Sequence, residues 1–325
     1  MKRALLVGSR GQDGSYLLRQ LGARGYEVVG IDRGGIQGAA PRSYPPVSIQ
    51  NKDDVLPLVA DFQPDEIYYL AAVHHSSEEM PVDDQDLVQR SFEINTLSLS
   101  NFLAAVERES RHSRLFYAAS SHVFGDPPCP IQDEDTPLNP TCPYGISKAA
   151  GLQLCRYYRR MHSLYCSAGI LYNHESPLRP AQFISQKIVR AAVRIKNKAQ
   201  DKLVVGNLDA LVDWGYAPDY VEAMWIILQL QEPADFVIAS GTLHSVRDFV
   251  EAAFEHLGLS WKEYVVEDPA LMRKRTFGAL QGKSAKLQSL TGWRPKTTFR
   301  EMVRDMVQAE MEKWTSRESD SQSHL

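Results

Sequence analysis

Short apolar runs alternate with amphipathic stretches along most of the chain. The apolar runs have the length and composition of strands buried on both faces of a parallel sheet, and they are residues 3–7, 26–31, 66–70 and 115–118. The stretches with helical spacing are residues 17–21, 53–62, 86–109 and 144–160. Strands that alternate with helices in this way predict an α/β protein with a doubly wound parallel sheet, the Rossmann arrangement.

Loops and chain length indicate a second, smaller domain. Residues 34–46 are rich in glycine and proline and predict a loop. A chain of 325 residues also exceeds what one compact core usually holds. We expect residues 1–172 and about 207–240 to form the Rossmann domain, and about 173–206 and 241–315 to form a smaller, interleaved substrate domain. The polar tail 316–325 is expected to fray.

Composition and charge narrow the possible partners. A net charge of −4 and an isoelectric point near 6.2 argue against nucleic acid or an anionic membrane, so a phosphate-bearing ligand needs a local cluster of basic groups. No apolar stretch reaches the ~18 residues of a membrane span, and the N-terminal apolar run is too short for a signal peptide. We therefore expect a cytoplasmic protein. The four cysteines lack CxxC spacing, which predicts buried free thiols and no metal site.

A glycine-rich turn follows the first predicted strand. Gly8, Gly11 and Gly14 stand in GSRGQDG, where backbone N–H groups and a helix N-terminus can approach a pyrophosphate. Asp32 ends the second strand, about 20 residues further on, where a carboxylate accepts hydrogen bonds from the adenosine ribose hydroxyls. Because a carboxylate repels a 2′-phosphate, the pattern favours NAD, while Arg33 keeps NADP open. The predicted cofactor-binding residues are Gly8, Gly11, Gln12, Asp13, Gly14, Asp32, Arg33, Leu70, Ala71, Ala72, Tyr144 and Lys148.

A tyrosine and a lysine one helical turn apart form the second motif. Tyr144 and Lys148 occur as Tyr-Gly-Ile-Ser-Lys at the start of a predicted helix, so both side chains project from one face. A lysine ammonium beside a phenol lowers the pKa of the phenol, and the tyrosinate can then take a proton from a sugar hydroxyl. Ser120 follows the strand at 115–118 and points into the same cleft. The order of glycine-rich turn, serine and YxxxK favours a catalytic role for this set.

These motifs and several longer segments resemble the extended short-chain dehydrogenase/reductase superfamily and, within it, the GDP-mannose 4,6-dehydratase family. The likeness covers nearly the whole chain and includes GQDGSYL at 11–17, QPDEIY at 63–68, PYG at 143–145, NHESP at 173–177, GNLDA at 206–210, DWG at 213–215, DYVEAMW at 219–225 and HSVR at 244–247. Residues 267–273 and 291–295 are also similar to the GDP-4-keto-6-deoxymannose reductases. The resemblance implies a nicotinamide cofactor, a GDP-sugar substrate and a homodimer or homotetramer.

The resemblance also assigns roles to single residues. Ser120, Tyr144 and Lys148 match the family's hydroxyl, phenol and amine. Two basic residues, Lys187 and Arg273, match positions that face the nucleotide diphosphate. The expected substrate-binding residues are Ser121, Asn173, Glu175, Arg179, Lys187 and Arg273.

Several positions depart from the dehydratase pattern. His122 stands two residues after Ser120, where the family has a glutamate. The other departures are Val212 for an arginine before Asp-Trp-Gly, Gly34 for an arginine after Arg33, and Ser48 and Thr276 for acidic residues. They indicate a relative whose cofactor and last chemical steps can differ from those of the family.

The reaction class depends on His122. If extended geometry persists beyond the strand, Ser120 and His122 project to the same side, toward the cleft. An imidazole can take the C5 proton of a sugar and protonate its C6 hydroxyl, so the first interpretation is a GDP-sugar 4,6-dehydratase with His122 as base and acid. The alternatives are a 4-keto-sugar reductase, a C4 dehydrogenase or a C4 epimerase, which need only Ser120, Tyr144 and Lys148. A structural role for His122 and a sugar-nucleotide-binding protein without turnover also stay open.

Overall fold

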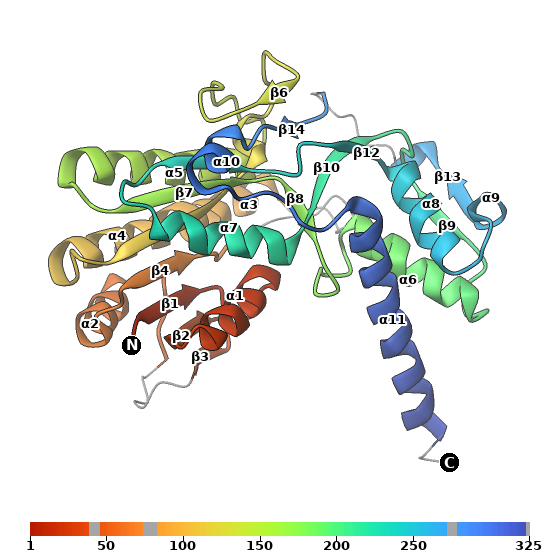
Figure 1. Ribbon diagram of the computed structural model, residues 1–325, viewed down its shortest axis with the longest axis horizontal. Helices are drawn as coiled ribbons and strands as arrows, with labels where there is room; N and C mark the ends of the chain where they lie inside the picture. Colours follow the sequence, from red (N-terminus) through yellow and green to blue (C-terminus); the bar gives the residue numbers. More distant parts are fainter. Residues whose placement is uncertain (39–45, 74–82, 272–277, 323–325) are drawn as a thin grey trace.

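The computed structural model describes residues 1–38, 46–73, 83–271 and 278–322, and it consists of a larger part built around one sheet and a smaller part beside it (Figure 1). Among the described residues the large sheet has seven strands in the order β11-β7-β5-β4-β1-β2-β3, of which only β3 runs antiparallel to its neighbour. The predicted doubly wound parallel sheet is confirmed. The strands are β1 (Arg3–Val7), β2 (Glu27–Asp32), β3 (Gly35–Gly38), β4 (Glu66–Tyr69), β5 (Arg114–Ser120), β7 (Cys166–Leu171) and β11 (Asp235–Ile238).

Strand β3 occupies part of the segment predicted to be a loop. Gly35 has a φ of +99°, which lets the chain turn back directly after β2, and Ile36 then pairs with Ile31. This pairing satisfies the outer hydrogen-bonding edge of β2. The glycine-rich composition concealed the strand, because Gly-Ile-Gln-Gly has no apolar run. Residues 39–45 lie outside the described residues.

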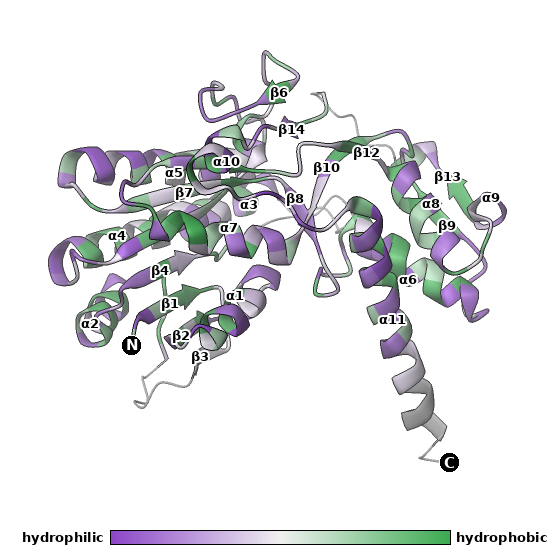
Figure 2. Cartoon of the chain, in the orientation of Figure 1, coloured by the Kyte–Doolittle hydropathy of each residue, from purple (hydrophilic) through white to green (hydrophobic). Residues whose placement is uncertain are grey.

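Helices cover both faces of the sheet. On one face, α2, α4 and α5 contribute buried side chains such as Phe102 and Leu152. On the other face, α1, α7 and α10 do so through Leu17, Met224 and Leu287. In Figure 2 these helices alternate between hydrophobic and hydrophilic positions, as one buried and one exposed side require. Their bounds are α1 (Gln12–Ala23), α2 (Lys52–Phe62), α4 (Ser98–Glu109), α5 (Pro143–His162), α7 (Ala217–Gln229) and α10 (Ala285–Thr291).

The helix predicted over residues 86–109 contains a π-helical turn. It consists of α3 (Asp84–Phe92), the π turn η1 (Glu93–Leu97) and α4. The extra residue of a π turn shifts the helix face, and it brings Asn95 and Thr96 into buried positions against α5. Thr96 Oγ1 donates to Ser147 O at 2.8 Å, so the turn is tied to the helix that carries Tyr144 and Lys148.

The smaller part has its own hydrophobic cluster around Trp214, Phe249 and Met306. It contains α6 (Ile184–Lys196), β9 (Leu203–Val205), α8 (Val246–His256), α9 (Trp261–Tyr264), β13 (Val265–Glu267), η3 (Pro269–Leu271) and α11 (Phe299–Gln322). Helix α11 continues through residues that were expected to fray. Between α8 and α11 the chain returns to the large sheet, because Leu287 and Trp293 pack there.

Short strands connect the two parts. The three-stranded sheet is β12-β10-β8, formed by β8 (Asn173–Glu175), β10 (Leu211–Tyr216) and β12 (Leu243–Ser245). A further pair joins β6 (Ile131–Gln132) to β14 (Gln281–Gly282). Asp213 on β10 is buried and accepts from Ser240 N, Ser240 Oγ, Gly241 N and Gly282 N, so its carboxylate fixes this junction.

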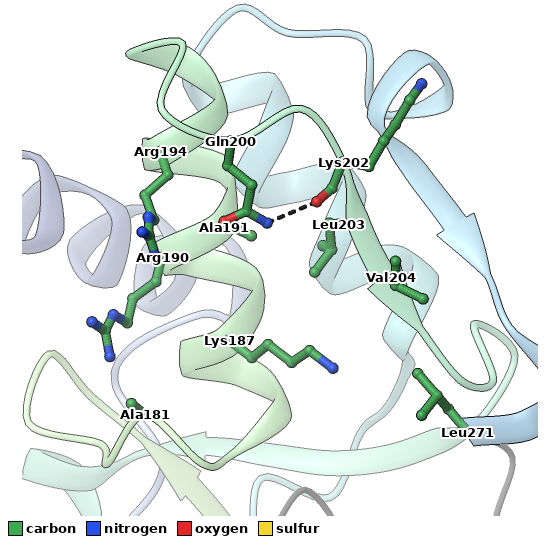
Figure 3. Close-up of a pocket in the computed structure, with 10 residues that line it drawn as sticks. All are labelled: Ala181, Lys187, Arg190, Ala191, Arg194, Gln200, Lys202, Leu203, Val204 and Leu271. Atoms are coloured by element: carbon green, nitrogen blue, oxygen red, sulfur yellow. Dashed lines mark hydrogen bonds between the residues drawn. The ribbon is translucent and has the colours of Figure 1, made fainter.

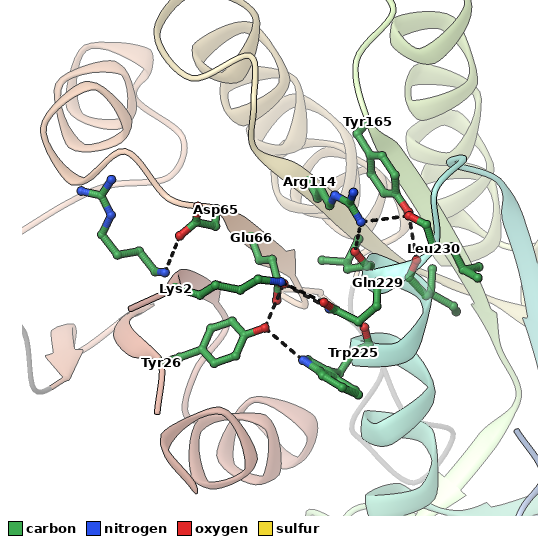
Figure 4. Close-up of polar contacts among 12 residues, drawn as sticks. Lys2, Tyr26, Asp65, Glu66, Arg114, Tyr165, Trp225, Gln229 and Leu230 are labelled. Carbon is green, nitrogen blue, oxygen red and sulfur yellow. Dashed lines mark hydrogen bonds and ion pairs between the residues drawn. The ribbon is translucent and has the colours of Figure 1, made fainter. Parts of the chain in front are cut away.

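A buried carboxylate holds the amino edge of the sheet together (Figure 4). Glu66 is 1% exposed and accepts from Lys2 Nζ at 3.0 Å, Tyr26 OH at 3.0 Å and Tyr68 OH at 2.7 Å. Gln229 Nε2 of α7 adds a further donor at 3.1 Å. These donors satisfy the Glu66 carboxylate within the protein at the amino edge of the sheet. A ligand is therefore expected at the opposite, carboxyl edge.

Candidate active site

The predicted site residues gather at the carboxyl edge of the parallel strands. Gly8 follows β1, Asp32 ends β2, Leu70 follows β4 and Ser120 ends β5. Because parallel strands end at one edge, four separate segments of the chain meet there.

The glycine-rich turn leaves no room for a side chain at Gly8 or Gly14. Gly8 has a φ of +93°, and a Cβ there would lie 2.8 Å from Ala71 N. A Cβ on Gly14 would lie 2.3 Å from Gly8 O. The turn therefore lies flat against the segment after β4 and leaves the N-terminus of α1 accessible to an anion. Ser9 Oγ is buried here without a hydrogen-bond partner among the described residues.

Asp32 lies beside this turn. Its carboxylate accepts from Arg10 N at 3.0 Å and from Arg33 N at 2.7 Å. The Arg10 guanidinium passes so close to Gly34 that a Cβ there would lie 2.1 Å from Nη1. The side chain of Arg33 is exposed. These two hydrogen bonds fix the Asp32 carboxylate at the end of β2, beside the glycine-rich turn.

The catalytic set predicted from YxxxK is brought together. The Ser120 hydroxyl lies close enough to the Tyr144 phenol to lower the pKa of the phenol. Lys148 is 1% exposed, donates from Nζ to Ala118 O at 2.7 Å and lies 5.8 Å from the centre of the Tyr144 ring. Helix α5 starts just before this set, with Pro143 in its first turn and Cys142 Sγ accepting from Gly145 N at 3.4 Å.

The ionisation of this pair differs from the expectation that Lys148 lowers the pKa of the phenol. Burial raises the pKa of Tyr144 to about 12, against the Ser120 hydroxyl and the charge of Arg179, which lower it. Burial lowers the pKa of Lys148 to about 7, against the charge of Asp13, which raises it. Near neutral pH the amine is then only partly charged, so its effect on the phenol is weak. The expectation failed because it neglected burial, which disfavours both charged forms.

His122 does not project from an extended strand. Strand β5 ends at Ser120, and residues 121–123 form the 3₁₀ turn η2 (Ser121–Val123), in which Ser121 is buried. The turn is capped by Ser120 Oγ, which accepts from His122 N at 3.3 Å. The imidazole nevertheless lies in the cleft: its ring meets Tyr144 edge-on at 5.7 Å between centres. Its Nδ1 lies 3.8 Å from Cys142 Sγ.

Strand β8 presents the residues expected to contact substrate. Asn173 begins the strand and is partly exposed, whereas Glu175 is 1% exposed. Glu175 Oε2 accepts from Ser185 Oγ at 2.6 Å and lies 3.0 Å from Arg179 Nε. Arg179 also stacks on Phe183 at 3.6 Å from the ring centre. These contacts fix Arg179 close enough for its charge to lower the pKa of Tyr144.

Lys187 lines a cavity of about 450 Å³ in the smaller part. In Figure 3 it extends from α6 into the space between α6 and β9, toward Leu271. Apolar side chains, including Leu203 and Val204, form the far wall. The other basic residues of the lining are Arg190, Arg194 and Lys202. Of these, Arg190 lies 3.7 Å from Glu310 and Lys202 Nζ donates to Glu263 O, so part of this positive charge is paired within the protein. Arg273 lies outside the described residues.

Four side chains at the site were missed or given another role by the sequence analysis. Asn95 Oδ1 accepts from Val73 N at 3.0 Å and its Nδ2 donates to Ser147 Oγ at 3.0 Å, which ties the segment after Ala72 to α5. An asparagine in the middle of a long helical stretch was the available signal. His174 Nε2 is hydrogen-bonded to the Asp13 carboxylate, and Gln12 Nε2 donates to His174 O on β8. Gln12 and Asp13, which were predicted to bind the cofactor, therefore make contacts within the protein.

The described residues contain no group of three or more His, Cys, Asp or Glu side chains that could hold a metal ion. No helix within the described ranges is both long enough and apolar enough to cross a membrane.

Comparison with known proteins identifies relatives over almost the whole chain. The family model described as GDP-mannose 4,6 dehydratase matches residues 5–306. The chain is 37% identical to GDP-mannose 4,6 dehydratase 2 of Arabidopsis thaliana over 331 residues, which cover 96% of this chain and 87% of that protein. It is 35% identical to GDP-mannose 4,6 dehydratase of Homo sapiens over 346 residues, covering 95% and 91%.

Solved structures share the fold at lower identity. RMD from Pseudomonas aeruginosa, complexed with NADPH, matches with a TM-score of 0.82 and 23% identity over 96% of this chain and all of that one. The dTDP-glucose 4,6-dehydratase of Bacillus anthracis, in complex with NAD, matches with a TM-score of 0.80 and 19% identity over 97% and 98%.

Proposed function

Because the chain belongs to the GDP-mannose 4,6-dehydratase family, we propose that it is a nicotinamide-dependent 4,6-dehydratase of a GDP-hexose of the mannose type, with His122 in place of the usual glutamate. The observation that carries this proposal is the place of His122. Its ring lies edge-on to Tyr144 with 5.7 Å between the ring centres, and its backbone N–H donates to Ser120 Oγ. One group can therefore act at C4 of a sugar while another reaches the neighbouring carbons.

The cofactor site fits NAD. Gly8 and Gly14 form a turn with no room for a Cβ atom, and the Asp32 carboxylate is held beside this turn. When bound, the cofactor takes a hydride from the sugar and later returns it. Since the Asp32 carboxylate repels a 2′-phosphate, NAD should bind more tightly than NADP. Asp32→Ala should reduce the difference in affinity between the two cofactors. Titration of each cofactor by quenching of intrinsic fluorescence tests this, and tighter binding of NADP to the parent contradicts it.

The residues divide the proton transfers among them. Tyr144 gives its own proton to the partly neutral amine of Lys148 and takes the proton of the C4 hydroxyl as that carbon becomes a ketone. The ketone acidifies the C5 hydrogen, which His122 removes. The imidazolium formed in this way then protonates the departing C6 hydroxyl, because a histidine can accept and donate protons near neutral pH. The returning hydride would go to C6, and C5 would take up a proton from solvent. Cys142, with its sulfur 3.8 Å from His122 Nδ1, restrains the ring during both transfers.

The cavity beside Lys187 is proposed to hold the nucleotide. Lys187, with Arg190 and Arg194 on the same helix, supplies positive charge for a diphosphate. Leu203 and Val204 supply an apolar wall against which a base can lie flat. Guanine follows from the family and not from this lining.

A second candidate is an oxidoreductase that interconverts hydroxyl and ketone at C4, such as a 4-keto-sugar reductase or C4 dehydrogenase, or a C4 epimerase. The observation that favours it is the turn η2, which starts directly after Ser120 and removes His122 from the direction of the strand. These reactions need only Ser120, Tyr144 and Lys148.

One incubation separates the candidates. The pure protein is mixed with GDP-mannose and NAD or NADP in deuterium oxide, and the products are identified by mass spectrometry. A dehydratase yields a 4-keto product lighter by one water and exchanges the C5 hydrogen. A product that keeps its water and its C5 hydrogen contradicts the dehydratase proposal and supports the oxidoreductase.

A further inference from the structure

The glycine-rich turn is bonded to strand β8 through His174. Its Nε2 lies 3.0 and 2.9 Å from the two carboxylate oxygens of Asp13, and its Nδ1 lies 2.7 Å from Tyr172 O. Gln12 Nε2 donates to His174 O at 3.0 Å, and Ser176 Oγ donates to Gln12 Oε1 at 2.8 Å. We refer to Gln12, Asp13, His174 and Ser176 as the clamp.

The surroundings of His174 fix its charge. The residue is 8% exposed, and its ring stacks on Tyr220 at 4.7 Å between centres. Each ring nitrogen faces an oxygen that can only accept, a carboxylate on one side and a backbone carbonyl on the other. Both nitrogens must therefore carry a proton, which makes the ring an imidazolium.

The neighbouring charges agree with this assignment. Burial alone would lower the pKa of His174, but the Asp13 carboxylate raises it above its ordinary value, with Arg179 opposing. Burial alone would raise the pKa of Asp13, but His174, Gln12 and Arg179 lower it. The charge of Asp13 also reaches Lys148 and Tyr144, and raises the pKa of both. The clamp therefore lies within the electrostatic field of the catalytic pair.

We propose that His174 is a positioning residue that locks the glycine-rich turn onto β8 while it is protonated, so that the cofactor side and the substrate side of the cleft form one rigid unit. The inference rests on the proposed nicotinamide site at that turn. It does not depend on which reaction follows, since dehydration, reduction and epimerisation all need the cofactor held against the sugar.

The pH dependence of the clamp has a definite sign. Because the pKa of His174 is raised, its contribution is fully present below the ordinary value of 6.5 and is lost as the pH rises through the raised pKa. Because the pKa of Asp13 is lowered, its contribution is present above 3.8 and is lost only as the pH falls through that lowered pKa. From mildly acidic to alkaline pH, only the loss at His174 is encountered.

The experiment is a double-mutant cycle on cofactor affinity. NAD binding is measured for the parent, His174→Gln, Asp13→Asn and the double variant at pH 6.5 and 9. At pH 6.5 each single change should weaken binding about tenfold, as expected for loss of a charged hydrogen bond. The double variant should be no weaker than the worse single variant, because both remove the same contact. Between pH 6.5 and 9 the parent should lose more affinity than His174→Gln does.

Two further variants separate positioning from stability. Asp235→Asn breaks another buried ion pair, with Arg156 and Arg159 at 2.6 Å each, at the start of β11 and away from the turn. It should lower the thermal midpoint and leave NAD affinity within twofold of the parent. Ser176→Ala removes the donor to Gln12 and, with it, the acceptor of Leu178 N, and should weaken NAD binding about threefold in a folded protein.

Hydrogen exchange of residues 8–14 without cofactor gives a readout that does not require NAD binding. Exchange should be faster in His174→Gln than in the parent and in Asp235→Asn. Three results would each overturn the clamp. They are an unchanged exchange rate of residues 8–14 in His174→Gln, additive losses of NAD affinity in the double-mutant cycle, and an NAD affinity of His174→Gln within twofold of the parent. If exchange is faster in His174→Gln but the parent binds neither NAD nor NADP, the result supports the clamp and contradicts the proposed function instead.

Discussion

At the scale of single residues, burial decides how the catalytic pair ionises. It raises the pKa of Tyr144 to about 12 and lowers that of Lys148 to about 7. In the described structure the phenol is therefore neutral near pH 7, and Lys148 has the pKa that suits proton exchange at that pH. Ser120 and Arg179 both favour the phenolate, so the sugar hydroxyl meets a phenol that its neighbours prepare for ionisation.

Lys148 is predicted to reduce the stability that the protein could otherwise have. Its pKa falls from 10.5 to about 7 on folding, so the unfolded chain binds a proton that the folded chain lacks between those pH values. The free energy of unfolding then rises with pH across this window. Lys148→Met should abolish turnover, raise the thermal midpoint at pH 7 by a few degrees (~2–4 °C per kcal/mol), and give a smaller gain at pH 10.

The matched control for this change is Lys286→Met. Lys286 Nζ also donates to a backbone carbonyl, that of Asp235 at 2.9 Å, but it lies away from the cleft. This control should lower the thermal midpoint and leave turnover intact. A lower midpoint for Lys148→Met at pH 7 would show that the bond to Ala118 O outweighs the cost of burying the amine.

His122 is the residue on which the reaction class depends. His122→Ala should still oxidise C4 and release a 4-keto sugar with reduced cofactor, because Ser120, Tyr144 and Lys148 are untouched. Loss of water should fall by about 10²–10⁴, the usual contribution of an acid–base group. Exchange of the C5 hydrogen with solvent deuterium, followed by mass spectrometry, should fall in parallel. Tyr144→Phe is the control, since it should abolish both oxidation and dehydration.

A purely structural His122 gives a different pattern. His122→Ala would then lower the thermal midpoint while the ratio of dehydrated to 4-keto product stayed that of the parent.

At the scale of elements, the sequence predicts what leaves a strong local pattern. The apolar runs 3–7, 26–31, 66–70 and 115–118 and the YxxxK helix were found because buried strands and helix faces repeat with fixed periods. The π turn was missed because one inserted residue hardly disturbs a long helical pattern. The turn at His122 was missed because Ser-Ser-His-Val contains neither glycine nor proline.

The contact between the glycine-rich turn and β8 could not be predicted from local patterns. Asp13 and His174 are 161 positions apart, and only the folded sheet brings the glycine-rich turn to β8. The ionisation of Lys148 depends in the same way on what surrounds it in three dimensions, and not on its neighbours along the chain.

Helix α1 offers a matched pair of glycine substitutions. Gly14→Ala places a Cβ 2.3 Å from Gly8 O, so the start of the helix must move away from the turn. NAD affinity should fall by at least tenfold, with a lower thermal midpoint. Gly22→Ala, in the same helix, meets nothing within 4 Å and should stabilise the protein by about 0.5–1 kcal/mol with unchanged affinity. Equal NAD affinities for the two variants, measured by fluorescence titration, would contradict the tight turn as part of the cofactor site.

At the scale of the whole molecule, one side of the large sheet carries exposed apolar residues. On α5, Ile146 is 43%, Tyr157 47% and Met161 60% exposed, and their spacing of 11 and 4 residues places them along one stripe. Leu97 and Val88, 58% and 41% exposed, lie on the neighbouring segment α3–α4. An exposed apolar stripe on adjacent helices marks an interaction surface.

We predict that this stripe pairs two copies of the chain in a four-helix interface. A stable dimer typically buries ~1,600 Å² in total, which two pairs of long helices can supply. Tyr157→Glu together with Met161→Glu places two like charges per subunit in the interface and should give a monomer near 36.6 kDa in sedimentation at micromolar concentration. Leu290→Glu, at a residue 59% exposed on α10, changes a comparable apolar side chain elsewhere and should leave the parent's assembly unchanged. The parent should sediment at twice the chain mass or more. A parent of 36.6 kDa, or a charged double variant that keeps the parent's mass, would show that the stripe on α5 is not the interface.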